Sequence, residues 1–161
     1  EHGISVSHEY LRLISNLDKN IVYDFFPPDI LDIYHKNKHK LLPLSKMTFY
    51  QIMHDCGKPL CLSFDDEGRK HFYNHAEHSY QQFKLVYPNL IDEAFMIFHD
   101  MDFHTKKTDE LVDLANSKYC FSLYLTAISE VIANSKMFGG VESDSFKIKV
   151  KKLKKHLKLF K

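Results

Sequence analysis

The chain has 161 residues, of which 44% are hydrophobic and 27% charged, a balance typical of one folded domain with a sizeable core. Its formal net charge is +1, so the molecule as a whole lacks the charge excess of an electrostatic nucleic-acid binder. Histidine is unusually frequent, with 11 residues, and it is the side chain most often used for metal binding and acid–base chemistry near neutral pH.

The cysteines and the hydropathy limit where the protein can reside. Cys56, Cys61 and Cys120 have neither paired nor metal-ligand spacing, which predicts reduced thiols and a cytoplasmic setting. No apolar run approaches the roughly 18 residues that a membrane span requires, and no signal-peptide pattern is present. We therefore expect no membrane partner. The chain begins at Glu1 without a methionine, and we expect either a trimmed chain or part of a longer one.

The first third of the chain predicts two helices separated by a proline break. Ser7 is a suitable N-cap, and apolar residues follow it at helical spacing as far as residue 17. This assignment places His8 in the first turn. Pro27-Pro28 interrupts any helix. A short helix over about 28–35 then leads into a basic loop.

The middle of the chain predicts a core-facing helix followed by a hairpin. Met47, Tyr50 and Met53 recur at helical spacing, and Gly57 is expected to end this helix as a left-handed C-cap. The segments 59–64 and 70–73 flank a turn that contains Gly68, which predicts two short antiparallel strands.

Three further helices and a basic tail complete the predicted fold. We expect helices over about 75–86, 90–98 and 118–138, and an amphipathic tail over 147–161. The tail is expected to pack Ile148, Leu153, Leu157 and Phe160 on the body and to leave its lysines in water. The fold class is thus mostly α, a bundle of about six to eight helices with a small β-hairpin near residues 59–73. Residues 1–140 form the main domain, and residues 141–161 form a basic amphipathic C-terminal helix or tail.

His54 and Asp55 indicate a metal site. They lie where the central helix is expected to end, and unpaired carbonyl groups make that end locally negative. An imidazole nitrogen and a carboxylate oxygen side by side suit a divalent cation. His99-Asp100 repeats the pair elsewhere, so the dipeptide alone does not identify the site.

The residues around this pair resemble a known family. His54-Asp55-Cys56-Gly57-Lys58-Pro59 is similar to the His-Asp-x-Gly-Lys-Pro signature of HD-domain proteins, the helical metal-dependent phosphohydrolase superfamily. The following segment 64–75 resembles HD domains related to tRNA nucleotidyltransferases and RNA end-healing enzymes. The resemblance covers about residues 1–140 and is concentrated in residues 45–80. It implies an HD-domain-like bundle that holds one or two divalent ions.

The same resemblance implies which residues are metal ligands. His8, His54 and Asp55 would hold the first ion, with His2 as an outer-shell or phosphate-contacting residue. His75 and His99 are candidates for a second ion, and His78 and His104 are in reserve. The family's late aspartate is replaced here: the string 125–130 ends in Ser129-Glu130. Glu130 is therefore the expected acidic ligand, and the alternatives are Asp100, Asp102 and Asp113.

Imidazole and carboxylate ligands suit Mn, Fe, Co, Ni or Zn, and Mg where more oxygen ligands are present. Asp55 and Lys58 are the predicted catalytic residues, because Lys58 can neutralise a substrate phosphate. Substrate contacts are also expected from Arg12, His78 and Lys106.

Two functions remain open from the sequence. The first is a metal-dependent phosphohydrolase that acts on a nucleotide or on a phosphate at an RNA or DNA end. The second is a catalytically inactive HD module that binds a nucleotide or a protein partner, which the missing aspartate favours. A weak nucleic-acid contact through the lysine-rich C-terminus is a further expectation.

Overall fold

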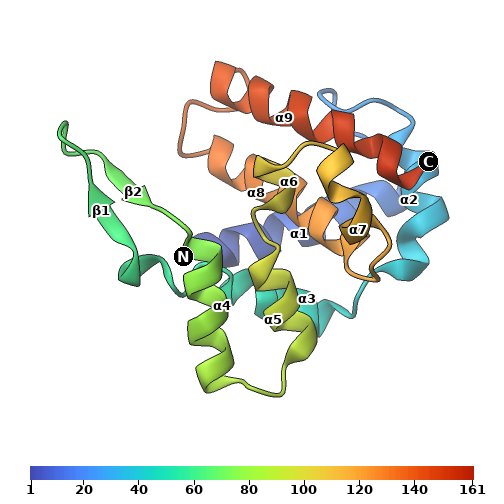
Figure 1. Ribbon diagram of the computed structural model, residues 1–161. Coiled ribbons are helices and arrows are strands. Elements are labelled where there is room, and N and C mark those ends of the chain that lie inside the picture. Colours follow the sequence, from blue (N-terminus) through green and yellow to red (C-terminus); the bar gives the residue numbers. More distant parts are fainter.

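The computed structural model describes residues 1–161 and is mostly helical, with one small two-stranded ribbon (Figure 1). Seven helices have eight or more residues: α1 (His2–Asp18), α2 (Ile30–Asn37), α3 (Leu44–Met53), α4 (His75–Val86), α5 (Ile91–Phe98), α8 (Cys120–Ser135) and α9 (Asp144–His156). Two are single turns, α6 (Asp102–Thr105) and α7 (Val112–Ala115), and the strands are β1 (Leu62–Phe64) and β2 (Lys70–Phe72). The expectation of a mostly α bundle with a hairpin near residues 59–73 is confirmed. No helix has the length and apolar character needed to cross a membrane.

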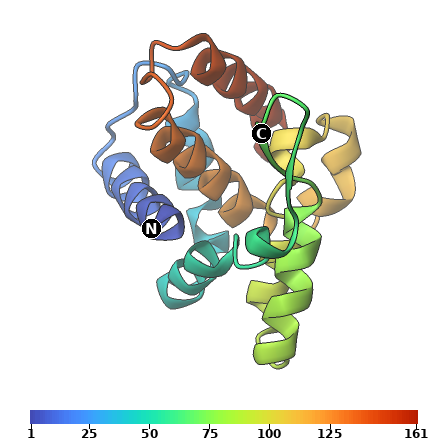
Figure 2. The same ribbon diagram turned by 90° about the vertical axis from the view of Figure 1, so that its left-hand side faces the viewer.

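Helix α8 is the centre of the bundle. Every residue in it is buried except Asn134, which is partly buried. Its small and apolar side chains allow neighbouring helices to approach from several sides. Helices α1 and α9 both pack against it, and Figure 2 shows the three as adjacent rods. One hydrophobic cluster joins side chains of all three helices, among them Tyr10, Tyr124 and Leu153.

Two glycines set how closely the helices approach beside the end of α3. A Cβ at Gly3 would lie 2.4 Å from the carbonyl oxygen of Gln51, and a Cβ at Gly57 would lie 2.3 Å from the amide nitrogen of Ser79. Only glycine fits at either contact. The start of α1 and the start of α4 are thereby held directly against the end of α3. The expectation of a left-handed Gly57 is wrong, because its φ is −89° and its role is this close contact.

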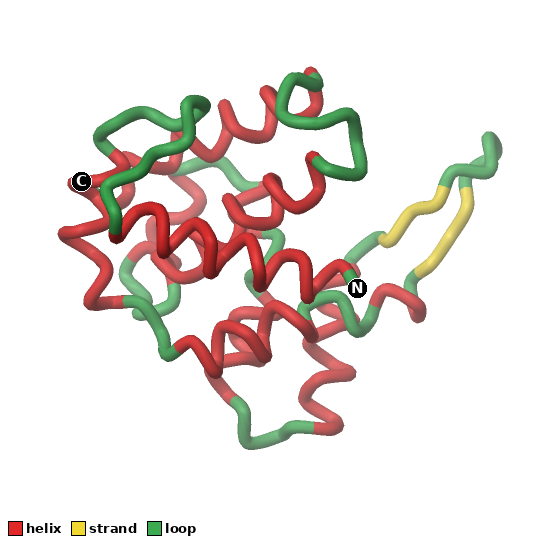
Figure 3. The backbone as a smooth tube through the Cα atoms, turned by 180° about the vertical axis from the view of Figure 1, so that it is seen from behind, coloured by secondary structure: helices red, strands yellow, loops and turns green.

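The hairpin projects from the helical body between α3 and α4 (Figure 3). Its strands pair antiparallel, with Ser63 opposite His71. Gly68 has φ +74° at the tip, as the turn prediction requires. Asp65 holds the turn, because its carboxylate accepts hydrogen bonds from the backbone amides of Glu67 and Arg69.

The two ends of the chain differ from their predicted form. Helix α1 begins at His2, and Ser7 is buried inside it instead of capping it. At the other end, Ser143 caps α9 by accepting a hydrogen bond from the amide of Phe146. Leu153, Leu157 and Phe160 are buried as expected, but Ile148 is 68% exposed, so its predicted contact with the body is wrong. Ile148 follows the buried Phe146 by two residues, which at about 3.6 residues per turn places it on the nearly opposite face of α9.

Candidate metal centre

His54 has a geometry suited to a metal ligand. It follows the last residue of α3 and is 2% exposed. Its Nδ1 donates to the carbonyl oxygen of Gln51 at 2.6 Å, which leaves Nε2 as the atom with a free lone pair. That Nε2 is buried and has no hydrogen-bond partner. A backbone carbonyl that fixes one ring nitrogen so that the other faces a cation is the usual arrangement for a metal-bound histidine.

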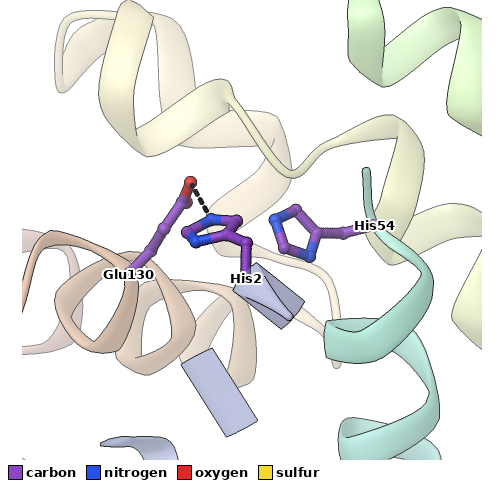
Figure 4. A group of neighbouring side chains, drawn as sticks. All are labelled: His2, His54 and Glu130. Atoms are coloured by element: carbon purple, nitrogen blue, oxygen red, sulfur yellow. Dashed lines mark ion pairs between the residues drawn. The ribbon is translucent and has the colours of Figure 1, made fainter. Parts of the chain in front are cut away.

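Two side chains from distant parts of the sequence converge on His54 (Figure 4). His2 opens α1, and its ring centroid lies 5.3 Å from that of His54. Glu130 lies on the buried helix α8, and its Oε1 is 3.6 Å from Nε2 of His2. One ligand atom from each of the three residues lies within 4.8 Å of the others. Two imidazoles and a carboxylate at this separation could hold one metal ion.

Asp55 completes the same cluster. Its Oδ2 lies 3.4 Å from Nε2 of His54 and 3.8 Å from Nε2 of His2. Lys58, one turn on, donates to this oxygen at 2.5 Å. The other oxygen, Oδ1, is buried without a hydrogen-bond partner and lies 3.7 Å from Nε2 of His75. His75 opens α4, and its Nδ1 lies 3.1 Å from the carbonyl oxygen of Phe72.

A second layer of polar side chains surrounds these residues. Nε2 of His104 lies 2.9 Å from Oε2 of Glu130. The hydroxyl of Tyr50 donates to Oδ1 of Asp100, and Oδ2 of Asp100 is buried without a partner. Such contacts orient ligands and tune their basicity. The unpartnered atoms of His54, Asp55 and Asp100 are exceptions to the rule that buried polar groups are hydrogen-bonded, and a cation bound between His2, His54 and Glu130 would satisfy the one on His54.

The cluster is also electrostatically coupled. Burial lowers the pKa of His54, but the carboxylates of Asp100, Asp55 and Glu130 outweigh it, so the pKa of His54 is raised. Burial raises the pKa of Glu130. The imidazoles of His104 and two other histidines outweigh this effect, so the pKa of Glu130 lies well below its ordinary value. Burial dominates at Asp100 and raises its pKa. The carboxylates thus favour positive charge next to them, and a divalent cation at the cluster would supply that charge while the imidazoles stay neutral as ligands.

The structure brings together most of the ligands predicted from the sequence. His54, Asp55, Glu130 and His75 lie in one cluster, and Lys58 is beside it. The choice of His8 is corrected, because His8 is exposed on α1. His2 takes the place beside His54, since α1 starts five residues earlier than its predicted N-cap.

The other predicted site residues lie elsewhere. Nδ1 of His99 is 2.7 Å from Oδ2 of Asp102, and its ring packs on Phe95, so it is not among the clustered ligands. Arg12 pairs with Glu9 on its own helix, away from the site. Lys106 pairs with Asp102, and His78 is partly buried on α4 with no side-chain hydrogen bond or ion pair. The roles of His104 and Asp100 depend on contacts between helices, which no local pattern in the sequence indicates.

Comparison of the sequence with models of known protein families and with curated proteins, and of the fold with solved structures, finds no match.

Proposed function

We propose that this protein is a metal-dependent phosphohydrolase of the HD type, acting on a phosphomonoester or phosphodiester of a nucleotide or of a nucleic-acid end. One observation carries the proposal. The buried and unpartnered Nε2 of His54 lies close to His2, Asp55 and Glu130. Along the chain, a histidine comes first, the His-Asp pair second and an acidic residue last. This is the order of ligands that the sequence resemblance implies.

The residues fit a resident cation. His2, His54, Asp55 and Glu130 would hold one divalent ion, and this mixture of nitrogen and oxygen donors suits Mn, Fe, Co, Ni or Zn. His75 beside the free oxygen of Asp55 offers a ligand toward a second ion. When bound, such an ion supplies Lewis acidity toward a phosphoryl oxygen and makes a water nucleophile accessible near neutral pH.

The protein's own side chains support the reaction in distinct ways. Lys58 carries its charge beside Asp55 at the rim and is 30% exposed, so it can turn to neutralise a substrate phosphate. Where no second ion is held, His75 has one ring nitrogen at the carbonyl of Phe72 and the other facing Asp55, which suits proton transfer to a leaving oxygen. His104 holds Glu130 in position. The free thiols of Cys56, Cys61 and Cys120 support a reducing, cytoplasmic location for the enzyme.

A catalytically inactive HD module that binds a nucleotide or a protein partner is the second candidate. The contact between Lys58 and Asp55 favours it, because an ammonium group 2.5 Å from a carboxylate oxygen already supplies a counter-charge there. A glutamate in place of the family's aspartate favours it as well. The two candidates differ in metal content and in turnover.

Metal analysis combined with a generic phosphoester assay tests the proposal. We expect the purified protein to bind Mn²⁺ and to hydrolyse p-nitrophenyl phosphate or its bis-ester. His2→Ala and His54→Ala should each lower metal affinity by roughly 10- to 100-fold or more and remove turnover. His8→Ala is the matched control, because His8 lies on the same helix as His2 but is exposed.

The control also gives the result that would overturn the assignment. If His2→Ala leaves both metal content and turnover unchanged, or if His8→Ala removes them, the cluster is not the metal site. If metal binds with the expected variant pattern but no phosphoester is turned over, the inactive module is the correct reading.

A further inference from the structure

The positive charge of this protein is concentrated at its C-terminus. Residues 144–161 contain eight lysines and one aspartate, whereas the preceding residues contain 14 Lys and Arg against 20 Asp and Glu. The near-neutral total therefore conceals two regions of opposite charge. Helix α9 carries the basic part and packs on α8 and α6, so its lysines extend from a fixed surface rather than from a mobile tail.

Six of the molecule's lysines line one hollow between α9 and the segment that follows α6. This lysine hollow has a volume of about 750 Å³. Its lysines are Lys106, Lys107, Lys151, Lys152, Lys155 and Lys158, and its lining includes one carboxylate, Asp109. A concave surface of one charge sign concentrates the electrostatic field and attracts ions of the opposite sign.

Most of these lysines have no internal partner. Lys106 pairs with Asp102, and Lys152 donates to the carbonyl oxygen of His104. Lys107, Lys151, Lys155 and Lys158 have no carboxylate within ion-pair distance. Like charges gathered in one hollow destabilise the folded protein. A polyanionic ligand bound there would remove that repulsion.

A second hollow shares Lys106 with the lysine hollow and reaches His75 at the edge of the candidate metal centre. This second hollow has a volume of about 490 Å³, and its polar lining includes Tyr73, His75, Lys106 and the carboxylates Glu77 and Asp102. His75 faces Asp55 across 3.7 Å. Tyr73 is 66% exposed and its ring stacks on that of His71. An exposed aromatic ring is a surface on which an unpaired base can stack.

We propose that the lysine hollow binds the phosphodiester backbone of a single-stranded nucleic acid, with one end of the strand directed through the second hollow toward the metal centre. The directional part of this inference rests on the proposed function. A membrane surface is disfavoured, because Ile148 is the only large apolar side chain of this segment that is exposed, whereas Leu153, Leu157 and Phe160 are buried in the core. The size of the two hollows together favours a chain over a single phosphate.

Binding of a labelled single-stranded RNA of about ten nucleotides tests the proposal. Fluorescence anisotropy is measured with a chelator present so that no metal is bound. The logarithm of the association constant should fall steeply with the logarithm of the salt concentration. Lys151→Glu with Lys155→Glu should weaken binding by about tenfold or more and reduce the salt dependence. Tyr73→Ala should weaken it by about fivefold or more without changing the salt dependence.

A matched variant separates the hollow from charge in general. Lys147→Glu with Lys154→Glu makes the same change in net charge on the same helix, at positions that do not line the hollow, and it should retain binding to within about twofold. Equal loss in both double variants overturns the proposal. So does equally tight binding of inorganic tripolyphosphate, or tighter binding of anionic phosphatidylserine vesicles than of RNA.

The outcome is distinguishable from failure of the proposed function. If the wild-type protein shows no turnover but RNA binding persists in it and in His54→Ala, strand binding is supported and the proposed enzymatic function is wrong. If the protein hydrolyses small phosphoesters but does not bind RNA, the proposed function is supported and strand binding is wrong. If both hold, Lys151→Glu with Lys155→Glu should lower kcat/KM for a terminal phosphate on RNA and leave p-nitrophenyl phosphate hydrolysis unchanged.

Discussion

At the scale of single residues, three buried or partly buried carboxylates show that the neighbouring side chains decide whether a carboxylate can serve as a metal ligand or stabilises the fold. Asp55 and Glu130 face imidazoles at the candidate metal centre, whereas Asp92 on α5 accepts from two lysines and a tyrosine. The first arrangement leaves ligand atoms unpartnered and fits a cation. The second is fully satisfied and contributes to stability, because charge-assisted hydrogen bonds are stronger than neutral ones.

Asp92 gives a prediction about pH. Lys46 first, then Lys118 and Tyr119, hold the pKa of Asp92 below its ordinary value of 3.8. A depressed pKa stabilises the folded state above the unfolded value, and this stability is lost as the pH falls through the folded pKa. Asp92→Asn should therefore lower the free energy of unfolding by about 1–2 kcal/mol at neutral pH, since its lysine partners are partly exposed.

Urea denaturation of both proteins between about pH 7 and pH 3 measures this effect. The difference between wild type and Asp92→Asn should be constant from about pH 7 to pH 5 and shrink below about pH 4. A difference that does not change with pH would show that the ion pairs are not its source. Asp113, an exposed carboxylate on α7, is the control position.

At the scale of elements, the site is built from helix ends. His2 opens α1, His54 and Asp55 follow α3, and His75 opens α4. The resemblance implied a site at the end of α3, but the contacts that bring the other helix ends there depend on Gly3 and Gly57. Neither contact is readable from spacing, because each joins segments more than 20 residues apart.

Gly3→Ala tests whether the close contact between α1 and α3 positions the site. Its Cβ would meet backbone atoms of α3, which cannot move aside as a flexible side chain can. We expect a loss of about 1–3 kcal/mol in the free energy of unfolding, together with weaker Mn²⁺ binding, because His2 would be displaced from His54.

Ser5→Ala serves as the control for this substitution, since Ser5 is exposed on the same helix. Thermal denaturation gives the stability and metal titration gives the affinity. Unchanged metal affinity in a folded Gly3→Ala protein would show that the contact does not set the position of His2.

At the scale of the whole molecule, the C-terminal helix belongs to the same hydrophobic core as α1 and α8. Phe146, Val150 and Leu153 are all buried in that cluster. Burial of one face of α9 fixes the opposite, lysine-bearing face in space. The basic surface and the candidate metal centre are thus held by one core, so the proposed strand binding and hydrolysis would take place on one rigid body.

A pair of substitutions on α9 checks this arrangement. Leu153 is 1% exposed and Ile148 is 68% exposed. Leu153→Ala should lower the free energy of unfolding by about 2–5 kcal/mol, because it removes buried methyl groups and leaves a cavity. Ile148→Ala should change it by less than about 0.5 kcal/mol.

Chemical denaturation with a single transition is the measurement. If Leu153→Ala has no more effect than Ile148→Ala, or if α9 unfolds in a separate earlier transition, the C-terminal helix is not part of the common core.

The sequence by itself determined the helical class, the hairpin, and the candidate roles of His54, Asp55 and Glu130, because periodicity, turn residues and a short motif are local properties. Only the tertiary structure decided that His2 rather than His8 faces His54, that His104 and Asp100 lie around the cluster, and that Lys106 and Lys107 join the lysines of α9. These relations depend on where helix ends meet, and that is set by close backbone contacts and core packing between residues far apart in the chain.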